Sequence, residues 1–526
     1  MSPKSRESFY VTTPIYYVND IPHIGHAYTT IAADVLARFK RLDGYQVFFL
    51  TGTDEHGQKV EKAARERGID PKAHCDEMVK RFQSLWKRLN ISNDDFIRTT
   101  EERHKAAVQK ILQALYDRGE IYQDSYQGWY CVPCERFWTE KDLADGNCPD
   151  CLRSVAEISE KNYFFKMSQY QAWLIDHVEK NDRFILPSSR RNEILGFLRA
   201  PLEDLCISRP KKRLAWGIEI PFDTDYVTYV WFDALINYVS AIGYGSEGNL
   251  FSRFWPEAVH LIGKDILTTH TVYWPTMLKG IGLTPPKRVF AHGWWTINGQ
   301  KMSKSLQNVV EPNRLIDLYG VDAVRFFLMR EVPFGVDGDF SHGTMVHRIN
   351  GDLANDLGNL FSRSLSMVLK YFGGEIPIPD PSATVETDQK LKQTTEKAYA
   401  EVSRHIDDIA FHKALASIWE IVNAANKYVD ETAPWALAKD EKNRPRLGTV
   451  LYGTLESLRV IALLLAAFMP STSEKMWSQL KMEGNILEQN LIEIIPGKKI
   501  KRLVLTDKGK RVTLSLQTLN SELTHS

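Results

Sequence analysis

The sequence predicts an α/β domain built on a parallel sheet, split by an inserted domain and followed by a domain made only of helices. Short apolar runs and helical patterns alternate at the start of the chain and again after about residue 220. A cysteine-rich stretch separates these two halves, and helical spacing alone continues after about residue 345. A chain of 526 residues is also too long for a single hydrophobic core.

The first elements form a βαβ unit with two polar loops. In chain order we expect a strand at 9–13, a loop at 14–22, a helix that ends near residue 44, a buried strand at 47–50, a loop at 51–57 and a charged helix that ends near residue 68. Parallel α/β domains bind ligands at the carboxyl ends of their strands. Both polar loops follow strands, so we expect them at the binding edge of the sheet.

The remaining divisions follow from changes of pattern. Strand-like segments resume at 226–232 and 258–262, and Tyr399, Val402 and Ile406 are spaced as in a bundle helix. We therefore divide the chain into the first half of the parallel-sheet domain (1–117), an inserted domain (118–220), the second half of the parallel-sheet domain (221–290), a lysine-rich loop with the region after it (291–345), a helical domain (346–495) and a basic tail (496–526).

Composition and charge predict a protein outside the membrane and leave nucleic-acid binding open. Hydrophobic residues make up 43% of the chain and charged residues 25%, as in soluble globular proteins. The apolar run 460–469 is too short to cross a bilayer, and residues 1–7 contain no apolar signal region. Lys plus Arg and Asp plus Glu both number 66, so a nucleic-acid partner would need a local basic face. We expect a cytoplasmic protein.

Two histidines stand where the first loop becomes a helix. His23 and His26 flank Gly25 at this junction. A helix N-terminus offers unpaired N–H groups and partial positive charge, which suit a phosphate, and two imidazoles can donate further hydrogen bonds there. Gly25 would let a flat base approach the backbone closely. For this segment alone, two satisfied structural histidines are the alternative.

A lysine motif, Lys301-Met302-Ser303-Lys304-Ser305, follows a turn-like segment at 297–300. Lys301 and Lys304 can reach the β- and γ-phosphates of ATP, and a mobile loop would close only when ATP is bound. Taken alone, a loop of this composition is usually solvated surface. Its occurrence together with a His-x-Gly-His segment at the first βα junction makes a chance explanation poor.

Four of the six cysteines form two Cys-x-x-Cys pairs, Cys131 with Cys134 and Cys148 with Cys151, separated by thirteen residues. Two such turns present four thiolates to one ion, a set typical of structural Zn²⁺ sites. Four thiolates leave no open coordination position, so we predict one structural zinc ion. Four reduced surface cysteines are the alternative.

The histidine and lysine motifs together resemble the paired signatures of the class I aminoacyl-tRNA synthetases, and the chain to about residue 440 resembles the methionyl-tRNA synthetase family. The resemblance implies a Rossmann-like catalytic domain split by a zinc-knuckle insertion and followed by an all-α anticodon-binding helix bundle. It implies a ligase that forms methionyl-adenylate from methionine and ATP with Mg²⁺, then attaches methionine to tRNA(Met). His23, His26, Lys301 and Lys304 would be catalytic and, with Gly25, would bind ATP.

The same resemblance implies a methionine site. Segment 14–19 matches the loop that supplies one pocket wall, 51–57 matches the acidic loop that pairs with the substrate ammonium, and 229–234 matches a strand whose tryptophan closes over the amino acid. The implied contacts are Ile15, Tyr17, Asp54, Trp231, Ala234, Leu235, Tyr238 and His270. At the position of Thr269 the family often has an aromatic residue. Methionine favours sulfur–aromatic contacts, which this set offers, although the aromatic members taken singly resemble core residues.

In the helical region, 359–363 and 426–435 match segments by which the family reads the CAU anticodon. Asn359 and Arg363 are four residues apart, so one helix face would present both to base edges. Trp435 would stack on an extruded base, with bundle packing as the alternative. The chain lacks an obvious appended oligonucleotide-binding barrel, which predicts a monomer, and its basic tail either assists tRNA binding or is solvated.

Three other interpretations stay open. A synthetase for Cys, Leu, Ile or Val would have zinc ligands near the active site or a large editing insertion. A small-molecule adenylyltransferase would lack the helical domain, and an RNA-binding or zinc-ribbon scaffold would have lost activity. The modest insertion, the helical domain and the intact His23, His26, Lys301, Lys304 and Asp54 argue against these alternatives.

Overall fold

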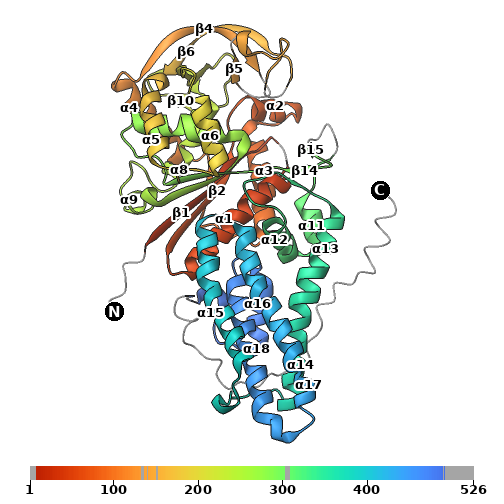
Figure 1. The fold of residues 1–526 in the computed structure, drawn as a ribbon. Coiled ribbons are helices and arrows are strands. Elements are labelled where there is room, and N and C mark those ends of the chain that lie inside the picture. The colour runs from red at the N-terminus through yellow and green to blue at the C-terminus, as the bar shows by residue number, and fades with distance from the viewer. Residues whose placement is uncertain are drawn as a thin grey trace.

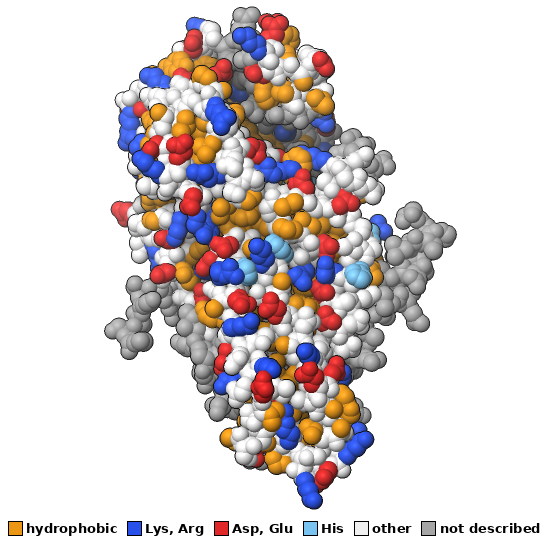
Figure 2. Space-filling view, viewed as in Figure 1, with side chains coloured by type: hydrophobic (Ala, Val, Ile, Leu, Met, Phe, Trp, Pro, Cys, Tyr) orange, Lys and Arg blue, Asp and Glu red, His pale blue; other side chains and the backbone are white. Residues whose placement is uncertain are grey.

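The computed structural model describes residues 7–19, 21–131, 136–138, 140–149, 152–302, 308–489 and 491. The molecule is elongated: α/β elements gather at one end, and long helices extend from them to the other end (Figure 1). On the face shown in Figure 2, basic and acidic side chains are interspersed over both parts. This distribution agrees with the equal numbers of basic and acidic residues.

A six-stranded sheet forms the centre of the α/β part. In spatial order its strands are β3 (Asp95–Arg98), β2 (Gln46–Asp54), β1 (Ser8–Tyr17), β12 (Ala258–Gly263), β13 (Arg288–His292) and β7 (Ile185–Leu186). All neighbouring strands in this sheet are parallel. Their carboxyl ends therefore lie along one edge, and the predicted parallel-sheet fold is confirmed.

The first two strands are longer than predicted. β1 continues through Pro14 to Tyr17, and β2 continues to Asp54, so the loops expected at both places begin later. The pairing of β1 with β2 shifts register between Thr12 and Ile15. Such an irregularity accommodates a proline, which lacks the N–H that a regular ladder needs. Tyr17 and Asp54 thereby become register partners at the ends of adjacent strands.

Four helices accompany the first half of the sheet: α1 (Ile24–Leu42), α2 (Gln58–Glu66), α3 (Pro71–Arg88) and α4 (Glu102–Asp117). Helix α1 is buried along most of its length because it contacts the sheet on one side and the helical part on the other. It begins soon after β1 ends, so its N-terminus lies at the carboxyl edge of the sheet.

The segment between the two halves of the sheet builds an antiparallel layer of its own. Its strands, in spatial order, are β5 (Arg136–Trp138), β4 (Ile121–Cys131), β6 (Ala156–Phe165) and β8 (Leu205–Cys206). Helices α5 (Gln171–Lys180) and α6 (Ser188–Phe197) follow β6. Strand β7 comes from the same segment but pairs with β13, so the inserted chain also extends the parallel sheet.

Only the beginning of the segment 226–232 forms a strand, and that strand lies outside the parallel sheet. β11 (Asp223–Thr228) pairs in antiparallel fashion with β9 (Ser208–Pro210) and β10 (Glu219–Ile220), outside the parallel sheet. The next residues form the short helix α7 (Val230–Leu235), so the prediction of a strand through Trp231 is wrong. Aromatic and β-branched residues favour a strand locally, but the burial of Val230, Phe232 and Leu235 on the helix overrides that preference.

From Pro312 on, the described chain is helical except for the two-residue strand β16 (Gly338–Asp339), and the helical part predicted after about residue 345 is confirmed. Its elements are α11 (Pro312–Tyr319), α12 (Val321–Arg330), α13 (His342–Arg348), the π-helix η7 (Ile349–Gly358), α14 (Asn359–Phe372), α15 (Glu386–Asp407), α16 (Phe411–Thr432), α17 (Pro434–Leu437), α18 (Arg444–Leu465) and α19 (Pro470–Gln479). Among the described residues one helical stretch, Glu441–Leu465, is long and apolar enough to cross a membrane. Because 83% of its apolar window is buried, it is a core helix of the bundle.

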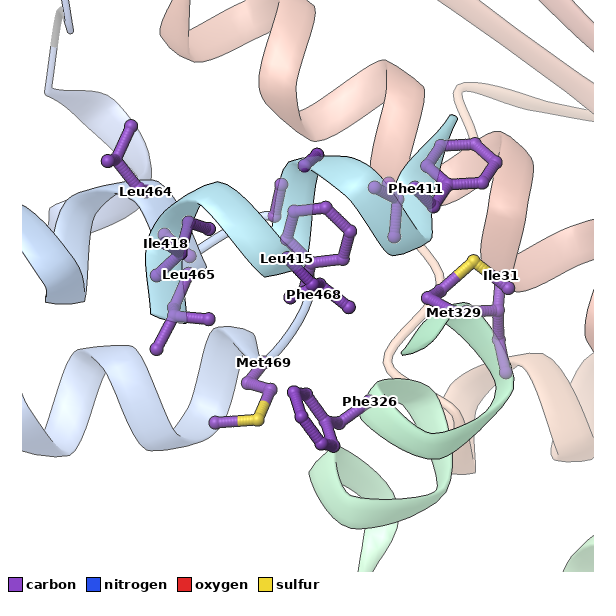
Figure 3. Close-up of a cluster of buried hydrophobic side chains, with 14 of the residues drawn as sticks. Ile31, Phe326, Met329, Phe411, Leu415, Ile418, Leu464, Leu465, Phe468 and Met469 are labelled. Atoms are coloured by element: carbon purple, nitrogen blue, oxygen red, sulfur yellow. The ribbon is translucent and has the colours of Figure 1, made fainter. Parts of the chain in front are cut away.

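A hydrophobic core joins the two parts of the molecule. Figure 3 shows side chains of α12, α16 and the end of α18 gathered near Ile31 of α1. The residues labelled there are Ile31, Phe326, Met329, Phe411, Leu415, Ile418, Leu464, Leu465, Phe468 and Met469. Since one cluster contains residues of both parts, they are packed against each other directly instead of being connected only by a linker.

A buried ion pair crosses the same interface. Arg325 of α12 donates from Nη2 to Oδ2 of Asp34 in α1 at 2.7 Å, and Nε and Nη2 donate to the carbonyls of Phe468 and Ala467 at 2.9 Å each. Both charged side chains are fully buried. Burial raises the pKa of Asp34, but the charges of Arg325 and Arg38 outweigh it and hold that pKa below its usual value. Helix α1 is thus tied to the turn after α18.

Candidate active site

A cavity of about 460 Å³ opens at the carboxyl edge of the parallel sheet, a size typical of small-molecule sites. Its walls come from the ends of β1, β2, β12 and β13, the start of α1, α7, α8 (Asn237–Ser240), η5 (Thr269–Tyr273), β14 (Trp295–Ile297) and β15 (Gln300–Lys301). All the described residues that we predicted to contact methionine or ATP line it: Ile15, Tyr17, His23, Gly25, His26, Asp54, Trp231, Ala234, Leu235, Tyr238, His270 and Lys301. Lys304 lies outside the described residues.

The two histidines cap helix α1. Nδ1 of His23 accepts from the N–H of Gly25, and Nδ1 of His26 accepts from the N–H of His23, both at 3.1 Å. Their rings stack with centroids 3.9 Å apart, and a Cβ at Gly25 would come within 2.9 Å of the His23 ring. Burial, with a smaller effect of His23, lowers the pKa of His26 well below its usual value. Neutral His26 therefore carries its proton on Nε2, from which it can donate to an anion.

Asp54 supplies a buried carboxyl group to the cavity. It is 3% exposed, and it ends β2 beside Tyr17. Its carbonyl accepts from the N–H of Val18 at 3.3 Å, so the sheet ladder fixes its place. A carboxylate buried in a cavity of this size is suited to a ligand ammonium, because an ion pair there offsets the cost of burying the charge.

Tyr238 and His270 form an aromatic end of the cavity. The Tyr238 hydroxyl lies 2.7 Å from Nε2 of His270, and Nδ1 of His270 lies 3.0 Å from the carbonyl of Ile266. A carbonyl can only accept, so His270 carries its proton on Nδ1 and accepts from Tyr238 at Nε2. Burial lowers the pKa of His270 to about 4, which keeps the ring neutral near pH 7. The preceding Thr269 is buried but is not among the lining residues.

A buried polar network holds two walls of the cavity together. Oδ2 of Asp233 lies 2.6 Å from Nδ1 of His56, and Oδ1 lies 2.7 Å from Nε2 of His104. His56 follows the strand that ends at Asp54, whereas Asp233 lies in the helix that carries Trp231. The network therefore fixes the acidic strand end against that helix. Sequence reasoning missed it because its three members are far apart in the chain.

Among the lining residues that sequence reasoning did not assign are Asn237, Asp265, His292 and Trp294. Nδ2 of Asn237 donates to the carbonyl of Ala234 at 2.6 Å, and Nε2 of His292 lies 2.6 Å from Oγ1 of Thr29 in α1. Proximity to a motif is the signal that could have found them. Asn237 precedes a predicted contact, Asp265 follows strand β12, and His292 and Trp294 lie at and just after the end of β13.

The predicted zinc ligands are described only in part. Cys131 ends β4, and both Cys131 and Cys148 are fully buried. Cys134 and Cys151 lie outside the described residues. Among the residues that the structure describes, no three His, Cys, Asp or Glu side chains are grouped as metal ligands, but two of the four predicted ligands fall outside that part of the chain.

The two helical segments predicted to read an anticodon are joined by an ion pair. Asn359 and Arg363 are both exposed on α14, and Nη1 of Arg363 lies 3.2 Å from Oδ1 of Asp430 in α16. Asp430 belongs to the second predicted segment, which continues to Trp435 in α17. Trp435 is 45% exposed, so part of its side chain is accessible. Helices α14 and α17 lie toward the end of the bundle that is far from the sheet (Figure 1).

Two family models match the chain, one over the α/β part and the first helices after it, the other over the rest of the helical part. The model described as "tRNA synthetases class I (M)" matches residues 9–157 and 153–365. The model described as "Anticodon binding domain of methionyl tRNA ligase" matches residues 378–500. The first of these matches alone covers more than half of the chain.

Individual relatives of the same family also resemble the chain over most of its length. The methionine--tRNA ligase of Caldanaerobacter subterraneus subsp. tengcongensis is 54% identical over 476 residues, which cover 90% of this chain and 74% of that protein. The ligase of Thermotoga maritima is 49% identical over 490 residues, with coverages of 92% and 77%. A structure of Mycobacterium tuberculosis methionyl-tRNA synthetase in complex with methionyl-adenylate matches with a TM-score of 0.92 at 42% identity, covering 96% of this chain and 99% of that one. Its apo form matches with a TM-score of 0.86 at 40% identity, with coverages of 97% and 99%.

The likeness extends through both parts of the fold and includes the sheet edge where the cavity opens. The chain therefore belongs to the methionyl-tRNA synthetases of class I, the ligases that attach methionine to tRNA.

Proposed function

We propose that the cavity at the sheet edge joins methionine to ATP and that the chain then attaches the methionyl group to tRNA(Met). One observation carries the proposal: a buried carboxyl group, an aromatic end and a histidine-capped helix N-terminus open into the same cavity. The methionine carboxylate attacks the α-phosphate, pyrophosphate leaves, and a ribose hydroxyl of tRNA then displaces AMP. No enzyme nucleophile is needed, so positioning and charge stabilisation account for catalysis.

In this proposal Asp54 binds the ammonium group of methionine and fixes its orientation. The side chain of the substrate lies among the apolar and aromatic residues Ile15, Tyr17, Trp231, Ala234, Leu235, Tyr238 and His270. Because Tyr238 donates to His270, the phenol and the imidazole are held at one end of the cavity. A thioether is polarisable and favours contacts with such rings, whereas a branched aliphatic side chain gains little from them.

ATP lies at the start of α1. Gly25 allows its base close to the backbone, His23 and His26 donate to phosphate oxygens, and Lys301 and Lys304 approach the β- and γ-phosphates. Mg²⁺ enters with ATP and neutralises phosphate charge. The neutral state of His26 supports this role, since its Nε2–H is a donor without requiring a buried positive charge.

We assign the zinc ion to Cys131, Cys134, Cys148 and Cys151. The full burial of Cys131 and Cys148 supports this assignment, because two thiolates shielded from water suit a structural ion that cross-links short loops. Elemental analysis is expected to find one zinc per chain, and Cys148→Ser is expected to lose it. A native, zinc-free chain with unchanged thermal stability would contradict the assignment.

Asn359, Arg363 and Trp435 are proposed to contact the anticodon. Their exposure on two segments joined through Asp430 supports a shared surface. We also propose that the chain acts as a monomer in the cytoplasm. Sedimentation at micromolar concentration tests the monomeric state, and cell fractionation tests the cytoplasmic location.

The decisive experiment is ATP–pyrophosphate exchange with each of the twenty amino acids. Methionine is expected to give the greatest stimulation, and charging of tRNA(Met) is expected to follow. Better stimulation by another amino acid would overturn the proposed substrate. Exchange with methionine but without tRNA charging would overturn the second step alone.

A further inference from the structure

We propose that Trp294 is a positioning residue that holds the ammonium group of Lys301 beside the cavity without neutralising its charge. The inference rests on the function proposed above and deepens its ATP-binding side. Trp294 is half-buried between β13 and β14 and lines the cavity together with Lys301. Nζ of Lys301 lies 3.9 Å from the centroid of the indole ring, a distance at which the ring attracts a cation.

The indole is fixed independently of Lys301. Its Nε1–H donates to Oδ1 of Asp265 at 3.0 Å, and the backbone N–H of Trp294 donates to Oδ1 of Asp337 at 2.8 Å. Oδ2 of Asp337 accepts from Nζ of Lys264 at 2.6 Å, and that ammonium group lies 4.1 Å from the same ring centroid. Two carboxylates and a second lysine therefore hold the indole ring in place through contacts that do not involve Lys301.

The two lysines differ in the charge that they leave available. Lys264 forms an ion pair with Asp337, which compensates its charge. Within the described parts of the chain Lys301 forms no ion pair, and its ammonium group is held by the ring. An aromatic ring attracts a cation through its quadrupole but carries no net charge. Lys301 therefore keeps its full charge for a phosphate, whereas a carboxylate in place of Trp294 would cancel it.

Placing the lysine before ATP arrives has an energetic consequence. A free lysine side chain loses rotamer freedom when it binds a phosphate, and a lysine already held near the site loses less. The contact between Lys301 and the Trp294 ring is therefore expected to favour ATP binding. Methionine binding should not depend on it, because the methionine contacts proposed above come from other walls of the cavity.

Fluorinated tryptophans incorporated at position 294 test the inference. Each added fluorine withdraws electron density from the ring face and weakens cation binding, while the shape of the ring changes little. The KM for ATP in pyrophosphate exchange is expected to rise stepwise with fluorine number, by roughly 3- to 10-fold over the series. The KM for methionine is expected to stay constant. The KM for ATP of Trp294→Phe should lie within the range of the fluorine series, and that of Trp294→Leu should lie at its highest end.

Two controls separate this effect from a structural one. The same analogues at Trp477, buried in α19 away from the cavity, should leave the KM for ATP unchanged. In a Lys301→Gln background the fluorine series at 294 should lose its slope. A slope that persists without Lys301, or a KM for ATP that is flat or falls as fluorines are added, overturns the inference. Each of these failures leaves the proposed function standing if the wild-type chain shows methionine-dependent exchange.

Discussion

Asp54 ends its strand with a carboxyl group that faces a cavity lined largely by aromatic and apolar side chains. If it pairs with the methionine ammonium, Asp54→Asn removes one charge of a buried pair, a loss of about 3 kcal/mol. The KM for methionine in pyrophosphate exchange should then rise roughly 100-fold, with a much smaller change in the KM for ATP. The exposed Asp182→Asn is the matched control. Equal changes in both KM values would show that Asp54 acts on the fold and not on the ammonium.

His270 predicts how stability depends on pH. Its folded pKa of about 4 lies below the usual 6.5 because burial disfavours the charged ring. Between these values the unfolded chain binds the proton and the folded chain does not, so stability is lost as the pH falls from 6.5 toward 4. The loss at pH 5 should be about 2 kcal/mol. Between pH 7.5 and 5 the melting temperature of the wild type should therefore fall further than that of His270→Gln; parallel decreases would contradict this origin.

Many of the residues that line the cavity were predictable from the sequence. The buried contacts that hold them in place were not. Asp54, Trp231 and Lys301 lie in local motifs, whose residue types reveal chemistry without knowledge of the fold. Asp233 and His56 carry no such local signal. Their contact depends on how α7 packs against the end of β2, which only the folded chain determines. Trp294 is intermediate, because it stands near the lysine motif but acquires its two cations through folding.

At the scale of elements, the order of strands and helices follows from periodicity, whereas their lengths do not. Apolar runs located β1 and β2, but the last residues of both strands are polar or interrupted by Pro14, so they looked like loops. Helix α7 shows the opposite error. Its six residues are too few for a helical period to emerge, and their propensity favours a strand. Tertiary burial decides such short segments.

Arg325 links three elements, and its removal should be costly. Arg325→Met leaves Asp34 with only part of its compensation and frees the carbonyls of Phe468 and Ala467. Removing one partner of a buried ion pair lowers the free energy of unfolding by about 3 kcal/mol or more. Urea unfolding should show that loss, and adding Asp34→Asn should cost less than the sum of the two single changes, since the partners are coupled.

The control for this prediction is the ion pair between the exposed Arg65 and the half-buried Glu61, whose nitrogen and oxygen lie 3.7 Å apart. Arg65→Met should change the free energy of unfolding by less than about 0.5 kcal/mol, because an ion pair whose cation stays in water contributes little. Losses of similar size for Arg325→Met and Arg65→Met would contradict the importance assigned to the buried pair.

At the scale of the whole molecule, α1 connects the cavity at the sheet edge to the helical part of the fold. It begins with the histidines that cap it at the cavity, contains Asp34 in its middle, and packs through Ile31 against the helical core. The sequence predicted a sheet domain and a helical domain, but it could not predict this interface. Arg325, the partner of Asp34 across this interface, lies 291 residues away in the chain, and nothing local marks it.

The exposed tryptophan at the far end of the bundle provides a test of the whole molecule. If Trp435 stacks on an anticodon base, Trp435→Ala loses about 1–3 kcal/mol, so kcat/KM for tRNA should fall roughly 10- to 100-fold. Exchange without tRNA should not change, because α17 lies far from the cavity (Figure 1). Trp435→Phe should recover part of the loss, and Phe197→Ala, which removes another exposed aromatic ring, should leave tRNA charging intact. A loss that appears equally in exchange would place the effect of Trp435 in folding and not in tRNA recognition.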